Sequence, residues 1–184
     1  MHWQPFIINS QKAVRNAQSQ NRLDKLKRAH NDTPDIVTQI NNQPFKIEFL
    51  GPVTETINDD RMFCWFTDSS HTRNGHSIII KITYGIRSIL LGGDLNSEAE
   101  DYLISQYGTA NPFRSDIAKS CHHGSSDFTT EFLGKIRPFA TVISSGDNES
   151  YAHPRVDTIG TDAICCARKY TRGLRPKVYS TEIA

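Results

Sequence analysis

The chain has 184 residues, and its 21 Lys and Arg against 20 Asp and Glu give a formal net charge of +1. This length predicts one globular domain with a buried core, and the charge balance excludes a strong overall field that would attract a polyanion. The apolar runs are far shorter than the ~20 residues of a membrane-spanning helix, and the N-terminus lacks the pattern of a signal peptide. We therefore expect a cytoplasmic chain with no membrane partner.

The four cysteines, Cys64, Cys121, Cys165 and Cys166, show no Cys-x-x-Cys spacing, and two of them are adjacent. This arrangement suits neither a disulfide framework nor a structural zinc site. We predict reduced and mostly buried thiols.

The first segment, residues 1–44, is polar and basic. Between residues 9 and 43 it carries Lys12, Arg15, Arg22, Lys25, Lys27 and Arg28 with few apolar interruptions. The pattern predicts an irregular or weakly amphipathic helix that ends before Asp32 to Pro34, because proline disfavours helix in the residue before it. A solvated helix face is favoured over a phosphate-binding stripe.

From Phe45 the pattern predicts a layered α/β domain. The expected strands span residues 45–50, 77–83 and 88–91, and the last two form a hairpin around Gly85. A helix at 97–107 begins with Ser97 as its N-cap and stops at Gly108. Strands at 116–119, 139–144 and 177–180 then alternate with helices at 129–136 and 156–170. This order indicates a mixed sheet flanked by helices.

Metal-capable side chains follow three of these strands. Asp94 comes after two glycines, His122 and His123 follow the strand at 116–119, and His153 lies in the loop after the strand at 139–144. Each alone has a plainer interpretation: a tight turn, a surface histidine pair and a loop residue. Together they are the ingredients of a one- or two-metal hydrolytic site, if they meet around one polar hollow.

These motifs also resemble a known family. The chain reads Asn74 to Ser77, Leu90 to Asp94, His122 to Ser125, Ser144 to Gly146, Tyr151 to Pro154 and finally Tyr179 to Glu182. Their order and spacing over about residues 45 to 182 resemble the metallo-β-lactamase superfamily, and are most similar to the hydrolase domain of bacterial competence DNA-uptake channel proteins. The resemblance implies the C-terminal half of an αββα sandwich.

The resemblance also implies roles for the site residues. Asp94 would bind or bridge metal, His122 or His123 would complete the site, and His153 would line the pocket and contact substrate or phosphate. The cofactor would be zinc or manganese, up to two ions, if the site is completed.

The resemblance leaves three neighbouring side chains without a role. Asn74 stands where other branches of the family have a histidine ligand. His71 and His76 flank it, and the sequence does not decide between them.

One departure from the family pattern governs the functional hypotheses. The His-x-His-x-Asp-His segment that supplies most of the family's ligands is absent, and a catalytic zinc generally needs three protein ligands. The first hypothesis is a metal-dependent hydrolase of phosphodiester bonds, completed by a partner chain, a homo-oligomer or a longer precursor. The second is a non-catalytic module that binds protein or nucleic acid through residues 9–43 and self-associates through an uncovered sheet face. The third is a fragment of a split gene.

Overall fold

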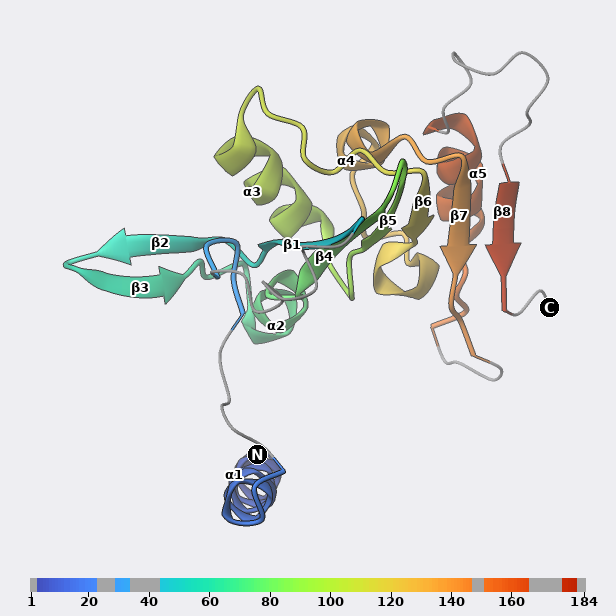
Figure 1. Ribbon diagram of the computed structural model, residues 1–184. Coiled ribbons are helices and arrows are strands. Elements are labelled where there is room, and N and C mark those ends of the chain that lie inside the picture. The colour runs from blue at the N-terminus through green and yellow to red at the C-terminus, as the bar shows by residue number, and fades with distance from the viewer. Residues whose placement is uncertain (1–2, 23–28, 34–43, 147–150, 166–176, 182–184) are drawn as a thin grey trace.

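The computed structural model describes residues 3–22, 29–33, 44–146, 151–165 and 177–181. Six strands form one sheet in the order β1-β4-β5-β6-β7-β8 (Figure 1). They span Phe45–Gly51, Ile79–Tyr84, Arg87–Leu91, Ile117–Lys119, Ala140–Ile143 and Lys177–Ser180. A separate hairpin pairs β2, Thr54–Ile57, with β3, Asp60–Phe63.

The sheet is mixed. β1, β4 and β5 pair antiparallel, whereas β5, β6, β7 and β8 pair parallel. The parallel half arises because each strand is followed by a helical segment that returns the chain to the same edge. The predicted α/β fold class with a mixed sheet and flanking helices is therefore confirmed.

Helices α3, Ser97–Tyr107, α4, Thr130–Ile136, and α5, Val156–Cys165, pack next to one another against one face of the sheet. Helix α2, Ser69–Gly75, contacts α3, and a short 3-10 helix, η1, at Cys121–Gly124, follows β6. The core beneath them contains Phe113, Phe132, Leu90 and Ile143, which are nearly or fully buried. The rings of Phe113 and Phe132 lie 5.0 Å apart. Burying a side chain of this size contributes about 2–3 kcal/mol.

The opposite face of the sheet has no comparable cover among the described residues. Alternation along a strand sends Leu90 into the core and Ile89 to this other face. Ile89, Ile117 and Val142 lie on inner strands yet keep 37%, 38% and 37% of their surface exposed. Among the described residues, this face of the sheet is therefore apolar and partly exposed.

The sequence placed most of these elements correctly but missed three. The β2–β3 hairpin and α2 were not predicted, and neither was η1. The N-terminal helix α1 spans Trp3–Ser19, so it begins earlier and ends earlier than expected. The predicted helix at 156–170 ends at Cys165 where the described range stops, and residues 166–170 lie outside it.

The cysteine prediction holds in part. Cys64, Cys121 and Cys165 are free thiols, and Cys166 lies outside the described residues. Only Cys121 is buried, whereas the other two are half-buried, so the expectation of mostly buried thiols was wrong for these two. Burial raises the pKa of the Cys121 thiol, which keeps it protonated and unreactive.

The N-cap of α3 is Asn96, not Ser97 as predicted. The Asn96 side chain accepts a hydrogen bond from the Ala99 amide at 3.1 Å and donates one to the His71 carbonyl at 2.9 Å. This side chain is fully buried, and the bond to the Ala99 amide is shielded from water. Asn96 thus connects the start of α3 to α2.

Replacing Asn96 with alanine tests this connection. We expect Asn96→Ala to lower the free energy of unfolding by about 2 kcal/mol, because the helix loses its cap and the His71 carbonyl loses its partner. Urea denaturation measures the change. Asn111, an exposed residue that donates to the Lys135 carbonyl, is the control. Asn111→Ala should cost about 0.5 kcal/mol, and an equal loss in both variants would contradict the role of Asn96.

Candidate functional site

The loops after three neighbouring strands form the candidate site. Asp94 follows β5, the two histidines of η1 follow β6, and Ser144 follows β7. These strands are parallel, so their carboxyl ends lie along one edge of the sheet. Open α/β sheets bind ligands at this edge.

The two glycines before Asp94 are required by close packing. A side chain at Gly92 would collide with the Cys121 sulfur, and one at Gly93 would come within 2.8 Å of Ser77 Cβ. Gly93 also has a φ of +62°, which favours glycine. The Asp94 amide then donates a hydrogen bond to Ser77 Oγ at 2.9 Å, which fixes the main chain of the loop at Asp94.

The η1 backbone is strained at both histidines. His122 and His123 have φ values of 47° and 55°, in the left-handed region that residues other than glycine seldom adopt. The His122 amide donates to the Gly93 carbonyl at 3.0 Å, and the Arg155 amide donates to the Gly124 carbonyl at 2.8 Å. Such strain persists when the surroundings impose it, and it clusters at functional sites.

Asp94 and His123 form a close pair. Asp94 Oδ1 lies 3.3 Å from His123 Nε2, and both side chains are partly exposed. The other ring nitrogen, Nδ1, donates to the Ser144 carbonyl at 2.6 Å, since a carbonyl oxygen can only accept. In the neutral ring Nε2 therefore presents a lone pair to the carboxylate. A proton or a metal cation between the two atoms would make this contact favourable.

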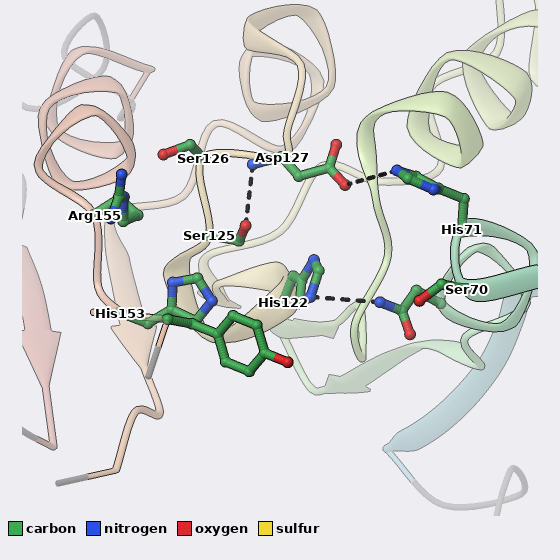
Figure 2. A pocket seen from close by; sticks show the side chains of 10 residues that line it. Ser70, His71, His122, Ser125, Ser126, Asp127, His153 and Arg155 are labelled. Atoms are coloured by element: carbon green, nitrogen blue, oxygen red, sulfur yellow. Dashed lines mark hydrogen bonds and ion pairs between the residues drawn. The ribbon is translucent and has the colours of Figure 1, made fainter. Parts of the chain in front are cut away.

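A polar pocket of about 640 Å³ lies beside this pair. Its lining residues are Ser70, His71, Asn74, His122, Ser125, Ser126, Asp127, Tyr151, His153 and Arg155. Figure 2 shows His122 between His153 and His71. The four predicted site residues thus divide into two groups, with His122 and His153 in the pocket wall and Asp94 paired with His123 next to it.

Ring contacts and one amide position the pocket imidazoles. The rings of His122 and His153 lie 6.0 Å apart, and Tyr151 stacks on His153 at 5.9 Å. Asn74 Nδ2 lies 3.4 Å from His122 Nε2, within reach of a weak hydrogen bond. Nδ1 of His122 is buried and makes no hydrogen bond to the described residues.

The structure distinguishes His71 from His76, between which the sequence did not decide. His71 lines the pocket, where its Nδ1 lies 3.0 Å from Asp68 Oδ2 and its Nε2 lies 4.0 Å from Asp127 Oδ2. The hydrogen bond with Asp68 raises the pKa of His71. His76 turns away, because its Nε2 lies 2.8 Å from the Cys64 carbonyl and its ring packs on Phe63.

A complete metal site is not formed by the described part of the chain. No group of three or more His, Cys, Asp or Glu side chains there is arranged to hold an ion. The pair of Asp94 and His123 nevertheless has suitable spacing. Two donors about 2.1 Å from a tetrahedral zinc are about 3.4 Å apart, and the observed separation is 3.3 Å. The pair therefore fits as two ligands of an incomplete site.

Comparison with known proteins shows partial similarity to competence proteins. The chain is 32% identical over 84 residues to ComE operon protein 3 of Bacillus subtilis strain 168, which covers 45% of the chain and 10% of that protein. It is 33% identical over 82 residues to competence protein ComA of Neisseria gonorrhoeae, covering 44% and 12%. Recombination protein 2 of Haemophilus influenzae matches at 35% over 74 residues, covering 40% and 9%.

These matches cover a small part of each relative, about a tenth of its length. No protein-family model matches the chain. Among the described helices, none has both the length and the apolar character needed to cross a membrane.

Several residues that line the pocket were not predicted as site residues, among them Asp127, Tyr151 and Arg155. Asp127 follows the histidine motif at a distance of only a few residues, and its Oδ1 accepts hydrogen bonds from the amide and hydroxyl of Ser97 at 3.2 and 2.5 Å. Arg155 and Tyr151 flank the predicted His153 in the same loop. Their closeness in sequence to the recognised histidine motifs was the signal that could have identified them as site residues.

Proposed function

We propose that this chain supplies one side of a metal-dependent, phosphodiester-hydrolysing centre of metallo-β-lactamase type. The observation that carries the proposal is the 3.3 Å approach of Asp94 Oδ1 and His123 Nε2, which matches the spacing of two metal ligands. The remaining ligands would come from outside the described residues, from a partner chain, a second copy or a longer polypeptide. When bound, zinc or manganese would lower the pKa of a water molecule and polarise a phosphoryl oxygen.

The hydrogen bonding of the two η1 histidines favours His123 as the ligand. A metal-binding histidine usually donates its second ring N–H to a carbonyl or carboxylate, which fixes the tautomer and orients the ring. His123 Nδ1 makes this bond to the Ser144 carbonyl. His122 Nε2 faces Asn74 instead. We therefore assign His123 to the metal and His122 to the pocket.

The pocket has the chemistry to bind a phosphate group. His122, His153 and Arg155 bring ring and guanidinium N–H donors, and Ser125 and Ser126 bring hydroxyls. Charge-assisted hydrogen bonds to phosphate are roughly twice as strong as neutral ones. In this proposal His153 orients the substrate, with Tyr151 stacked on its ring to hold it in place.

The comparisons support a nucleic acid as the phosphodiester substrate. The relatives include competence proteins and a recombination protein. Because the chain spans about a tenth of each relative, substrate and activity are proposals for this chain and rest on the pocket chemistry as well.

A second candidate function is a non-catalytic binding module. Two observations favour it: the described residues bring only a pair of metal donors together, and one face of the sheet is open and apolar. In this alternative the chain binds a protein or nucleic acid, and the basic residues Lys12 and Arg15 of α1 would contact phosphates.

Metal titration of single variants tests the ligand assignment. In calorimetry we expect zinc to bind the chain more weakly than a complete site would, because the described residues supply only two ligands. We expect Asp94→Asn or His123→Asn to weaken this binding by at least about tenfold, since each removes a direct ligand. Asparagine tolerates the left-handed backbone at position 123. His122→Asn, at the neighbouring position with the same backbone, and His76→Asn should leave the affinity within about twofold.

Two outcomes would contradict this assignment. A larger loss of zinc affinity in His122→Asn than in His123→Asn would show that His122, and not His123, is the ligand. Zinc binding that is unchanged in Asp94→Asn would also contradict it. If, in addition, the chain in extracts of its source cells does not hydrolyse bis-p-nitrophenyl phosphate with zinc or manganese, the binding module is favoured.

A further inference from the structure

Helix α2 brings another carboxylate–imidazole pair to the pocket, apart from Asp94 and His123. Its imidazole is His71, which lies three residues before Asn74, so both side chains share one face of the helix. Both line the pocket, and Asn74 Nδ2 lies 3.4 Å from His122 Nε2. His71 therefore lies within one helical turn of the contact between Asn74 and His122.

The carboxylate of this pair, Asp68, fixes the orientation of the His71 ring. Asp68 Oδ1 accepts hydrogen bonds from the amides of His71 and Ser70 at 2.9 and 2.7 Å, and Oδ2 lies 3.0 Å from His71 Nδ1. These bonds, the one from the His71 amide first, hold the pKa of the Asp68 carboxyl below its usual value. An ionised carboxylate only accepts, so Nδ1 donates to it. The other ring nitrogen, Nε2, is turned toward Asp127 in the pocket wall (Figure 2).

The main chain of His71 is held as firmly as its ring. The His71 carbonyl accepts a hydrogen bond from Nδ2 of the fully buried Asn96 at 2.9 Å. Asn96 lies two residues after Asp94 and caps α3, so the loop that carries Asp94 also positions His71. A group that acts on a substrate needs this kind of support, because small errors in its position lower the rate.

Three carboxylates from three elements act on the His71 ring. Asp68 is the N-cap of α2, Glu98 lies in the first turn of α3, and Asp127 lies in the loop before α4. The hydrogen bond from Asp68 is the largest cause that raises the pKa of His71, and the charges of Glu98 and Asp127 add to it. Asp127 is itself held in place, because its Oδ1 accepts from the Ser97 amide at 3.2 Å. The basic groups that line the same pocket are His122, His153 and Arg155.

We propose that His71 is the general acid of the phosphodiester hydrolysis, and that it donates the proton on Nε2 to the leaving oxygen. This inference rests on the proposed function and adds a catalytic residue to it. A water oxygen forms the new bond to phosphorus and gives one proton to the solvent. The bond between phosphorus and the leaving oxygen breaks, and that oxygen keeps the electron pair and takes the proton from Nε2. His71 is then neutral and regains a proton from water.

The surroundings of His71 favour donation of a proton over abstraction of one. A general base must be neutral, whereas nearby carboxylates favour the charged imidazolium. Asp127 Oδ2 lies 4.0 Å from His71 Nε2, which is longer than a hydrogen bond. A substrate oxygen in the pocket could therefore take this proton without breaking a bond to Asp127. In this proposal Asp68 is a positioning residue, which orients the ring and keeps it charged.

Two phosphodiesters with different leaving groups test the role of His71. Thymidylyl-(3′–5′)-thymidine releases a sugar alkoxide, a strong base that needs a proton, whereas bis-p-nitrophenyl phosphate releases the weakly basic p-nitrophenolate. The whole chain is isolated from its source cells with any bound partner and assayed with zinc or manganese. We expect His71→Gln to lower kcat for the dinucleotide by about 100-fold. Its kcat for bis-p-nitrophenyl phosphate should fall by less than about threefold, since a leaving group that needs no proton gains little from an acid.

Two further variants serve as controls for these assays. Asp94→Asn should abolish both activities, which identifies any hydrolysis by contaminating enzymes. His30→Asn, at a histidine that lies beside Arg61 and outside the pocket lining, should change neither activity.

The pH dependence tests the role of Asp68. The acid must carry its proton, so the dinucleotide rate should fall as the pH rises through the pKa of His71. Asp68→Asn removes the carboxylate that raises this pKa, so the fall should begin at a lower pH. Titration of the imidazole nitrogens by ¹⁵N NMR measures the same shift without any assay of activity.

Different failures have different meanings. Equal losses toward both substrates in His71→Gln, or no loss toward the dinucleotide, would overturn the role of His71 as the acid while the proposed hydrolysis stands. An NMR titration of His71 that is the same in Asp68→Asn and the parent would overturn the role of Asp68. A parent chain that hydrolyses neither substrate would overturn the proposed function, and the acid would fall with it.

Discussion

Gly124→Ala is expected to lower the free energy of unfolding by about 3 kcal/mol, from a forced left-handed backbone and a steric clash together. Gly124 has a φ of +81°, and a Cβ there would come within 2.9 Å of Pro154 Cβ and 3.0 Å of Ile143 Cγ2. Neither neighbour is the end of a flexible chain. Chemical denaturation followed by tryptophan fluorescence measures the loss.

Gly160 is the matched control for this substitution. It lies within α5, and a Cβ there would meet nothing within 4 Å. Gly160→Ala should therefore be neutral or stabilise by up to about 1 kcal/mol, since alanine is the better helix former. If both variants have the same stability, the contact between η1 and the 153–154 loop is not tight. Gly124→Ala should also weaken phosphate binding, because it separates His122 from His153.

Glu100 is expected to make the protein less stable as the pH rises. Its side chain is fully buried in α3, and burial raises its pKa from 4.5 to about 8. Between these values the folded state holds a proton that the unfolded state has released. The free energy of unfolding should therefore fall by about 1.4 kcal/mol per pH unit. The stabilisation is complete below pH 4.5 and is lost once the pH exceeds about 8.

Urea denaturation from pH 5 to 9 in two variants isolates this contribution. Glu100→Gln keeps an oxygen to accept from the Thr129 amide, as Glu100 does at 2.5 Å, but cannot ionise. Its profile should be flatter than that of the parent. It should not become flat, because burial also raises the pKa of Asp162, to about 7. Asp101→Asn, an exposed change on the same helix, should keep the parental slope. If stability falls as steeply with pH in Glu100→Gln as in the parent, Glu100 is not the source of the pH dependence.

Strong local patterns explain which parts of the fold were predictable. The strand at Lys177–Ser180 and the hairpin around Gly85 were placed correctly, because alternation and a glycine turn specify them locally. The β2–β3 hairpin was missed although Asn58 and Asp59, both with positive φ, form its two-residue turn. This Asn-Asp pair is a hairpin signal, but the short polar strands beside it gave little alternation to support it.

Long-range packing explains the rest. Helix α2 is seven residues long and has no apolar stripe, so its only local sequence signal was the N-cap residue Asp68. Ser97 resembled a cap, yet Asn96 holds that position because it also reaches the His71 carbonyl. The sequence placed Asp94 and His123 near one another by motif order. That His123 faces the carboxylate while His122 faces the pocket depends on two consecutive left-handed residues, which no local pattern predicts.

The loops at the edge of the sheet are joined through main-chain atoms. The His122 amide bonds to the Gly93 carbonyl, and the Arg155 amide bonds to the Gly124 carbonyl. Since neither bond uses a side chain, a substitution at position 122 or 123 leaves both bonds in place, provided that the new residue tolerates the left-handed backbone. The conformation of the loops is therefore set by the main chain, and the chemistry of the site by the side chains that the main chain carries.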